Sequence, residues 1–339
     1  MSAGESLLEL SMNDAAELFS DAIKDFIPQN EKKPKVVYRS AGDTYVLVEY
    51  GDMALDLNFT FRVYDLDQAL KDLDLKGLNE TAPGVRSLLV NYNNLELPLH
   101  DLLDHLKEIE DTLPPLGKAE VPSRIIHLPI AYRERWTKEA IDKYMNSVRA
   151  EAPYLPDNLE FVARCNGLKK AQDVITYHTS TKYMVLALGD VYLGAPCAVA
   201  LDPRRRLVVP KYNPARMWTP AGAVGMGGSY VCIYAMESPG GYQLIGRTLP
   251  IWNTYQTSPS FEEAPWFFRP FDRIQFKEVT ETEIEKMRKD MLSGDYKPEI
   301  EEGVFDLEKH NSFCDSVREE VEKFKEKQRE AVSRWTEDY

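Results

Sequence analysis

The sequence predicts a mixed α+β fold in which β-structure dominates: an α/β sandwich, then a closed or nearly closed barrel, with a helical extension at each end. Between residues 34 and 131, short β-rich runs alternate with helical patterns, an order typical of a two-layer, broadly ferredoxin-like sandwich. Between residues 182 and 276, glycine- and proline-rich turns interrupt apolar runs about every eight to twelve residues, which indicates a barrel. Charged helical patterns lie at both ends of the chain.

Residues 1–33 form the predicted N-terminal helical extension. Within residues 12–28, apolar side chains recur with helical period and share one face: Ala15, Leu18, Phe19, Ile23 and Ile27. Residues 29–34, Q-N-E-K-K-P, are expected to be a polar linker. We expect the apolar face to pack against the rest of the chain, and docking on a partner is the alternative.

Residues 34–131 are predicted to form the ferredoxin-like α/β domain. A hairpin is expected around S-A-G-D at 40–43, because β-rich runs flank it on both sides. The remaining expected elements, in chain order, are a helix ending at Leu75, a strand at 87–90, a helix at 99–113 and a strand at 124–130. The resulting order is β-β-α-β-α-β.

Residues 132–278 are predicted to form a helical connector and the barrel. The connector has helical patterns over 136–166, with Thr137 as N-cap and Gly167 as the stop, and a shorter helix that ends at His178. A histidine at a helix C-terminus interacts favourably with the helix dipole, so capping is the role we expect for His178.

Residues 279–339 form the predicted C-terminal helical extension. It opens with the capping-box pattern T-E-T-E at 280–283 and ends in a charged helix over 307–335. Charges of alternating sign predict a solvated helix, with docking of a neighbouring module as the alternative.

Composition excludes several classes of protein. With 55 acidic and 41 basic residues the net charge is −14, which argues against a nucleic-acid partner. No apolar run approaches the roughly 20 residues of a membrane span, and the acidic N-terminus does not have the pattern of a secretion signal. The four cysteines form no C-x-x-C and have no histidine at ligand spacing, so we expect reduced thiols, no metal site and a cytoplasmic protein.

The segment from Gly189 to Thr248 holds the candidate functional residues, because polar side chains lie beside its tight turns. We expect these turns to line one hollow shaped for a flat, amide-like molecule. The candidates are Asp202 and Arg247; Lys211, Tyr212, Asn213 and Arg216 in a proline-bounded loop; and Ser238, Gly240, Gly241, Tyr242 and Gln243 around a glycine turn.

Each of these patterns also has a purely structural explanation. S-P-G-G at 238–241 can be a tight hairpin, and Arg247 can pair with Asp202 to seal the barrel. Asp202 precedes a proline, where an aspartate commonly starts a turn by accepting a hydrogen bond from nearby backbone. The run R-R-R at 204–206 can be a solvated charge cluster or can bind a phosphate or carboxylate.

Several motifs carry a family resemblance. They are G-D-V-Y-L-G-A-P at 189–196, N-P-A-R-M-W-T-P-A at 213–221 and E-S-P-G-G-Y-Q-L-I-G-R-T at 237–248. Together they resemble the KipI-like half (allophanate hydrolase subunit 1) of the urea carboxylase carboxyltransferase domain. More distantly they are similar to the kinase inhibitor KipI and to a 5-oxoprolinase subunit. The form G-S-Y-V-C-I-Y at 228–234 favours the urea carboxylase branch.

The resemblance implies an N-terminal ferredoxin-like domain and a cyclophilin-like barrel. It also implies a reaction in which carboxybiotin releases its carboxyl group and a urea-type nitrogen attacks the carbon. Such a site needs donors for a developing negative charge and a base for the nitrogen proton. Accordingly, Lys211, Asp202 and Arg247 are the candidate catalytic residues, and the other candidates would bind substrate.

The chain has neither the A-M-K-M biotinyl-lysine motif nor a glycine-rich ATP-grasp loop. We therefore expect no covalently bound cofactor, biotin presented by a partner chain, and as partners a KipA-like subunit, biotin carboxylase and carrier chains. Three hypotheses remain: a carboxyltransferase-type subunit, a non-catalytic KipI-like regulatory protein, and a stand-alone enzyme with lactam or cyclisation chemistry in the barrel.

Overall fold

The computed structural model describes residues 21–30, 33–189 and 194–337. The chain forms two compact units. One extends to Glu120 and includes Asp306–Asn311, and the other comprises Val121–Phe305 with Ser312–Tyr339.

The N-terminal unit is an antiparallel sheet with two helices packed on it. The strand order is β1-β2-β3-β5-β4, with β1 at Ile23–Ile27, β2 at Val36–Ser40, β3 at Tyr45–Tyr50, β4 at Leu78–Pro83 and β5 at Ser87–Tyr92. The helices are α2 (Leu57–Leu73) and α3 (Leu99–Thr112). Alternate residues of the strands, such as Tyr38, Val48 and Val90, pack against Leu66 and Leu106 of the helices.

A buried ion pair joins the two helices of this unit. Arg62 on α2 donates from Nε to Glu110 Oε1 on α3 at 2.9 Å, and the hydroxyl of Tyr50 donates to Glu110 Oε2 at 2.9 Å. Arg62 is 4% exposed and Glu110 is 1% exposed, so water solvates neither charge. The three side chains therefore satisfy one another inside an otherwise apolar core.

Two predictions for this region are wrong. Residues 23–27 form the edge strand β1, which pairs with β2, instead of the end of a helix; residues 12–20 lie outside the described part. The spacing of Ile23, Phe26 and Ile27 is helical, but backbone pairing with β2, with a register shift between Ile23 and Asp25, makes this segment a strand. The strand expected at 124–130 belongs to the barrel of the other unit, and β4 was not predicted from the sequence. The ferredoxin-like prediction is therefore not confirmed.

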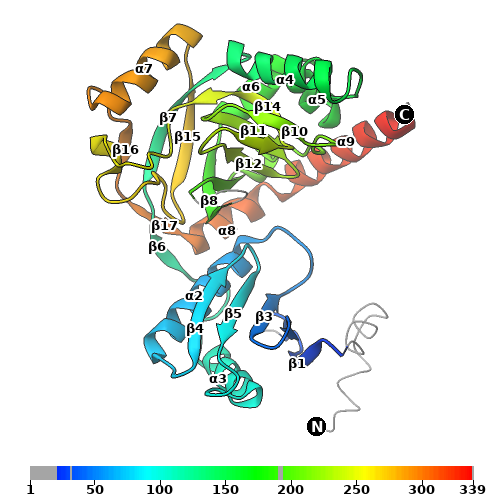
Figure 1. Ribbon diagram of the computed structural model, residues 1–339. Helices are drawn as coiled ribbons and strands as arrows, with labels where there is room; N and C mark the ends of the chain where they lie inside the picture. The colour runs from blue at the N-terminus through cyan, green and yellow to red at the C-terminus, as the bar shows by residue number, and fades with distance from the viewer. Residues whose placement is uncertain (1–20, 31–32, 190–193, 338–339) are drawn as a thin grey trace. The chain divides into compact units, whose positions relative to one another are not determined.

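The second unit is built on a closed barrel (Figure 1). The sheet order is β14-β11-β12-β9-β8-β15-β7-β16, and pairing of β14 with β7 closes the barrel and leaves β16 at its edge. The strands are β7 (Ile125–Tyr132), β8 (Lys182–Leu188), β9 (Pro196–Ala200), β11 (Ala223–Gly227), β12 (Tyr230–Ile233), β14 (Gln243–Thr248), β15 (Arg273–Glu278) and β16 (Glu299–Glu301). This barrel fits the cyclophilin-like fold that the resemblance implies.

Short ribbons and helices complete this unit. Strand β10 (Arg216–Thr219) pairs with β13 (Ser238–Gly240), and β6 (Glu120–Pro122) pairs with β17 (Val304–Asp306). Helices α4 (Arg135–Ser147), α5 (Asn158–Cys165) and α6 (Ala171–Thr179) gather on one side of the barrel (Figure 1). The single-turn 3₁₀ segments are Pro203–Arg205 and Pro259–Phe261.

Of two helix starts predicted from capping residues, the structure confirms that of α7 and not that of α4. Thr280 caps α7 (Glu281–Ser293) through a reciprocal capping box with Glu283, as predicted. Helix α4 begins earlier than predicted, because the Glu134 carboxylate accepts the amide protons of Trp136 and Thr137 and takes the N-cap role expected of Thr137.

His178 is not a solvent-facing helix cap. Its ring is fully buried, stacks on Phe276 with centroids 4.3 Å apart and has Nδ1 2.7 Å from the Tyr132 hydroxyl. Burial lowers the pKa of His178 to about 3, so the imidazole is neutral at physiological pH. The prediction of dipole capping is therefore wrong, because packing against β15 outweighs the helix-end position.

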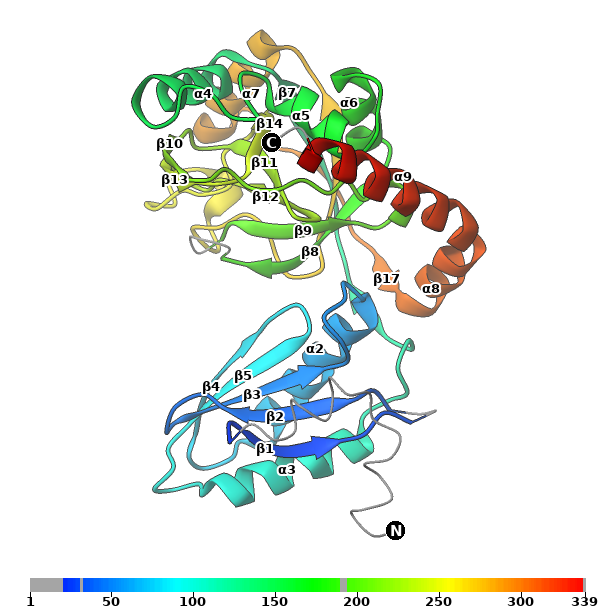
Figure 2. The same cartoon turned by 90° about the vertical axis from the view of Figure 1, so that its right-hand side faces the viewer.

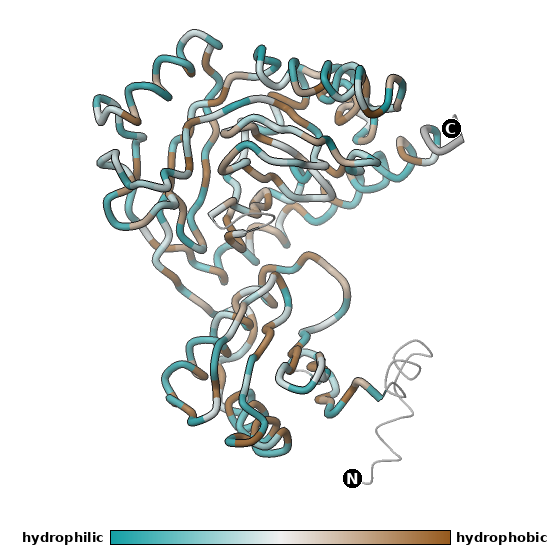
Figure 3. Tube along the Cα trace, in the orientation of Figure 1, coloured by the Kyte–Doolittle hydropathy of each residue, from teal (hydrophilic) through white to brown (hydrophobic). Residues whose placement is uncertain are grey.

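The predicted C-terminal extension, residues 279–339, contains α7, the short strands β16 and β17, and then α8 (Leu307–Ser316) and α9 (Arg318–Glu337). Helix α9 runs along the outside of the second unit (Figure 2), where Val321 and Phe324 are buried. The rest of its length is mostly hydrophilic, as is α7 (Figure 3). Gln328 donates from Nε2 to Asn166 Oδ1 and to the Arg206 carbonyl at 2.7 and 2.9 Å, so α9 is fixed to the barrel unit.

Two of the exclusions drawn from the sequence can be compared with the structure. No helix in the described part of the chain combines the length and apolar character that a bilayer span requires. The four cysteines all lie in described residues and form no disulfide, and burial raises the pKa of Cys165 to about 11.

Candidate functional site

The two predicted polar segments, loop 211–216 and turn 238–243, lie against each other. The amide of Tyr212 donates to the carbonyl of Gly241 at 2.6 Å, and Arg216 is the register partner of Gly240 in the β10–β13 ribbon. The Lys211 ammonium lies 4.8 Å from the centre of the Tyr242 ring. The structure therefore brings together most of the residues that the sequence singled out.

Arg216 is the most buried charge of this region, at 1% exposure. Its Nη1 donates to the carbonyl of Tyr242 at 2.7 Å, and its guanidinium lies 4.4 Å from the centre of the Tyr212 ring. Longer contacts of 3.3 to 3.4 Å reach the hydroxyls of Thr219 and Tyr234. No carboxylate in the described residues forms an ion pair with it, so backbone, hydroxyls and an aromatic face surround this charge.

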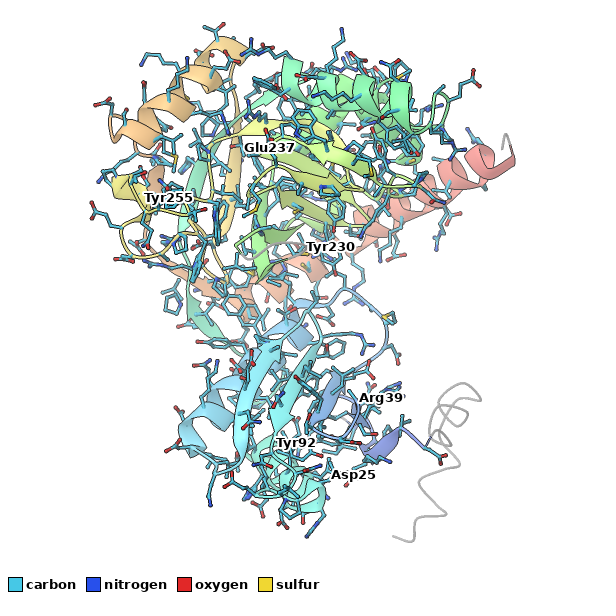
Figure 4. All side chains as sticks on the ribbon, in the orientation of Figure 1. Asp25, Arg39, Tyr92, Tyr230, Glu237 and Tyr255 are labelled. Carbon is cyan, nitrogen blue, oxygen red and sulfur yellow. The ribbon has the colours of Figure 1, made fainter. Side chains whose placement is uncertain are left out.

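Two buried polar atoms in turn 238–243 have no hydrogen-bond partner in the described structure: Ser238 Oγ and Gln243 Oε1. Gln243 is fixed from its other end, because Nε2 donates to the Pro210 carbonyl at 2.8 Å. Glu237, directly before the turn, is exposed (Figure 4). An unpaired buried polar atom costs about 1–3 kcal/mol, so these two positions would gain from a ligand or a water molecule.

The glycines of this turn differ in how closely they are packed. A Cβ on Gly240 would lie 2.2 Å from the Tyr234 hydroxyl, whereas a Cβ on Gly241 would meet nothing closer than 3.7 Å. Gly240 is therefore required by the close approach of Tyr234, and Gly241 is not required by packing.

Tyr212 and Asn213 are held by the segment between α4 and α5 and by Asn158, the first residue of α5. The Tyr212 hydroxyl donates to Asn158 Oδ1 at 2.9 Å, and its ring packs on Tyr154 with centroids 4.1 Å apart. The Asn213 carbonyl accepts hydrogen bonds from Tyr154 and Arg149 at 3.1 and 3.0 Å. Burial raises the pKa of Tyr212, and the hydroxyl remains protonated. The loop is thus held by Arg149, Tyr154 and Asn158, which were not among the predicted site residues.

Asp202 lies in a different environment. Its carboxylate accepts hydrogen bonds from the Arg204 backbone at 3.0 Å and from the Arg204 guanidinium at 2.9 Å. Burial opposes ionisation of Asp202, but the hydrogen bonds from Arg204 outweigh it and hold the pKa below its ordinary value. Arg204 also pairs with Glu320 on α9 at 3.0 Å. These contacts agree with the turn-starting role for Asp202 and leave its carboxylate engaged.

Arg247 lies in a cluster with Arg288 of α7. Arg247 Nε and Arg288 Nη2 donate to the same acceptor, the Ala221 carbonyl, at 2.9 and 3.2 Å. The guanidinium of Arg247 is 5.2 Å from the centre of the Trp136 ring. Burial lowers the pKa of both arginines, and the charge of Arg247 lowers that of Arg288 further. Sequence reasoning missed Arg288 and Trp136, which only the tertiary fold brings to Arg247.

Arg247 and Gln243 lie apart on one strand. They are four residues apart on β14, which corresponds to about 13 Å at 3.3 Å per residue. Their side chains also donate to different carbonyls, Gln243 to that of Pro210 and Arg247 to that of Ala221, so the common hollow stays a prediction.

A cavity of about 440 Å³ lies elsewhere in the second unit. Its lining includes Arg124, Trp266, Arg269, Lys297 and Ile300, and none of the predicted site residues. One group in the described residues has metal-ligand spacing: His127, Glu299 and Glu301, whose potential ligand atoms lie within 4.8 Å of one another.

Comparison with known proteins places this geometry in context. Residues 36–261 match the family model described as carboxyltransferase domain, subdomain C and D. The chain is 42% identical over 299 residues to the urea amidolyase of Saccharomyces cerevisiae, which is 88% of this chain and 16% of that protein. It is 29% identical over 235 residues to a 5-oxoprolinase subunit of Escherichia coli O157:H7, covering 69% of this chain and 92% of that bacterial protein.

The structural comparison agrees with the sequence comparison. The crystal structure of the Kluyveromyces lactis urea carboxylase matches 96% of this chain with a TM-score of 0.83 and 37% identity. That match spans 29% of the carboxylase chain. The chain therefore corresponds to a minor part of the length of each of these urea-processing proteins, and to nearly the full length of the bacterial 5-oxoprolinase subunit.

Proposed function

Because the chain belongs to the family of the carboxyltransferase domain, subdomains C and D, we propose that it supplies the KipI-like half of a carboxyltransferase site for a urea- or amide-like substrate. The remaining half, the biotin carboxylase and the biotin carrier would come from other parts of an assembly. The support is the match to urea amidolyase and urea carboxylase across most of this chain.

The observation that carries the proposal is the pair of unpartnered buried atoms at turn 238–243. A urea-type substrate has N–H donors that fit the Gln243 oxygen and a carbonyl that fits the Ser238 hydroxyl. Transfer of a carboxyl group builds negative charge on oxygen, and fixed donors in a water-poor site stabilise such charge. The nearby Arg216 guanidinium would add positive charge without forming an ion pair.

The three candidate catalytic residues have unequal support. Lys211 is the favoured base or charge-stabilising group, because it lies in the exposed loop beside the turn. Asp202 has weaker support because Arg204 engages its carboxylate. Arg247 has weaker support because its Nε is bound to the Ala221 carbonyl and it lies far from Gln243 along β14.

The match to the 5-oxoprolinase subunit favours a second candidate function. A lactam presents the same amide donor and acceptor to Ser238 and Gln243 as a urea does. In that case the chain would form half of a site for a cyclic amide, completed by another subunit.

We also propose a ferredoxin-like sandwich for the N-terminal unit, and its strand order supports this. In this unit the strand order is β2-β3-β5-β4, and helices follow β3 and β5. A β-α-β-β-α-β sandwich has the same arrangement when its last strand is moved to the start of the chain. The expected strand at 124–130 would then be replaced by β2.

Reconstitution tests these functions. The chain is mixed with a KipA-like half, biotin carboxylase and biotinylated carrier, and urea- or 5-oxoproline-dependent ADP release from ATP is measured in bicarbonate. We expect urea-dependent turnover only when this chain is present. Ser238→Ala and Gln243→Leu should each lower kcat/KM by about 100-fold, with Ser293→Ala on the exposed surface of α7 as the control.

Each outcome separates the hypotheses. Turnover with 5-oxoproline instead of urea supports the lactam function. Unchanged turnover without the chain, or with both variants, contradicts a catalytic role and supports a regulatory one.

A further inference from the structure

Strand β16 carries an arrangement of side chains that the proposed function does not use. This three-residue strand pairs antiparallel with β7 at the edge of the barrel sheet, with Glu299 opposite His127 and Glu301 opposite Ile125. His127 Nε2 lies 2.5 Å from Glu301 Oε1. The ligand atoms of His127, Glu299 and Glu301 all lie within 4.8 Å of one another.

The edge strand is poorly stabilised by its own side chains. All three residues of β16 are exposed, so little apolar burial holds the strand on β7. Glu299 and Glu301 are two residues apart, so they point to the same face and their carboxylates repel each other. Arg273 also acts on this face, because its charge interacts with that of Glu301. Its guanidinium donates to Ser123 Oγ at 2.8 Å.

We propose that His127, Glu299 and Glu301 bind a divalent transition-metal ion of the zinc class, and that the ion fastens β16 to β7. An imidazole nitrogen with two carboxylate oxygens is a ligand set that zinc, nickel and cobalt accept. Magnesium and calcium select oxygen ligands instead, and this site provides a nitrogen. Water would occupy the remaining coordination position.

The spacing of the ligand atoms is compatible with such an ion after small rotations. Bonds of about 2.0–2.2 Å from zinc to nitrogen and oxygen place tetrahedral ligand atoms about 3.3–3.5 Å apart. The three atoms here all lie within 4.8 Å of one another, so side-chain rotation has to close the widest separation by at most about 1.3–1.5 Å. The two exposed glutamates can rotate freely, and the ion would replace the present contact between His127 and Glu301.

Binding of the ion would also affect the 440 Å³ cavity. Lys297, Pro298 and Ile300, in and just before β16, form part of the cavity lining. Fixing β16 on β7 would hold that wall in place. The site is thus structural and distinct from turn 238–243, and it stands whether or not the proposed function holds.

The test is zinc binding to the purified, untagged full-length chain in reduced form, measured by competition with a chromogenic chelator. We expect one site that His127→Gln weakens at least about tenfold, since loss of even an outer-shell partner costs 10- to 100-fold. Glu299→Gln and Glu301→Gln should weaken it similarly. His105→Gln is the matched control, because His105 lies near Glu108 on α3 in the other unit.

Hydrogen exchange provides the second measurement. Zinc should slow exchange of amides 299–301 at least about tenfold in the wild-type chain, and not in the His127→Gln variant. Equal zinc affinity of wild type and His127→Gln would overturn the site, for example if cysteine thiols bind the ion. Zinc binding through His127 without slower exchange in β16 would overturn the fastening role. Unchanged melting of the variants without zinc shows that they fold.

Discussion

Substituting Gly240 by alanine should disrupt turn 238–243, whereas the same change at the next residue should not. A Cβ at Gly240 would lie 2.2 Å from the Tyr234 hydroxyl and 2.4 and 2.6 Å from two ring carbons, so the whole ring must shift. Inserting a methyl group into a packed site costs about 1–3 kcal/mol. Gly240 lies outside the left-handed region, so the cost arises from packing and not from the backbone.

Moving Tyr234 carries a further cost. Its hydroxyl accepts hydrogen bonds from Arg216 Nη2 and from the Tyr242 amide, both at 3.4 Å. Each such bond is worth about 0.5–1.5 kcal/mol, and these long ones belong at the low end. The total expected loss in the free energy of unfolding is therefore about 2–4 kcal/mol. For Gly241→Ala, with no atom closer than 3.7 Å, we expect a change within about 0.5 kcal/mol.

Urea denaturation followed by tryptophan fluorescence measures this difference in the right unit. The tryptophans of the chain, Trp136, Trp218, Trp252, Trp266 and Trp335, all belong to the second unit. The signal therefore reports the barrel and not the N-terminal sheet. Equal losses for the two variants would refute the idea that Tyr234 excludes a side chain at Gly240.

Three further predictions concern other parts of the molecule. Glu110→Gln leaves the Arg62 charge buried and should lower the free energy of unfolding by about 3–5 kcal/mol, measured by circular dichroism melts. A Glu110→Leu/Arg62→Met double variant should recover most of this loss. No recovery would contradict a simple ion pair. The pKa of His178 is about 3 in the folded chain and 6.5 ordinarily. The contribution of the neutral ring to the free energy of unfolding is therefore fully present above pH 6.5. It should fall by about 1.4 kcal/mol per pH unit as the pH drops toward 3. His178→Gln should flatten this dependence in urea titrations, and an unchanged slope would assign it to other groups. Phe324→Ala should free α9, with a loss of about 3–5 kcal/mol and faster amide exchange in that helix; unchanged exchange would mean that its other contacts, such as Val321, Glu320 and Gln328, hold it without Phe324.

Local patterns predicted those elements whose side chains alternate between core and solvent. The runs at 36–38, 45–48 and 87–90 became strands because one face of each contacts the helices of the same unit. Thr280 and Glu283 predicted the start of α7, because a capping box is satisfied entirely within four residues. In these cases the information that decides the structure lies within a short stretch of chain.

Predictions failed where a distant segment decides the outcome. Ile23–Ile27 is a strand because β2 offers an edge to pair with, and Ile125–Tyr132 joins the barrel because β14 and β15 pair with it. His178 satisfies the rule for a helix-end histidine, yet the ring is buried by Phe276, nearly one hundred residues later. A single sequence contains no signal for such pairings.

The same distinction applies to the candidate site. The sequence grouped loop 211–216 with turn 238–243 correctly, because both are dense in glycine, proline and polar groups. It could not show that Tyr154, in the segment before α5, and Asn158, at the start of α5, support the loop. It also could not separate Asp202 and Arg247 from the turn, since proximity along the chain says little about proximity around a barrel.

Arg247 illustrates how the fold decides the use of a charged residue. In the motif G-R-T, an arginine on a barrel strand could present its charge to a substrate. The structure instead places it beside Arg288, with both guanidiniums donating to the Ala221 carbonyl. Two adjacent positive charges repel each other, and the charges of Glu134 and Glu285 compensate them. Because Ala221 closely follows β10, which carries Arg216, the arginine pair fixes the ribbon that supports turn 238–243. Arg247 can therefore influence that turn by positioning its support, without contacting any ligand bound there.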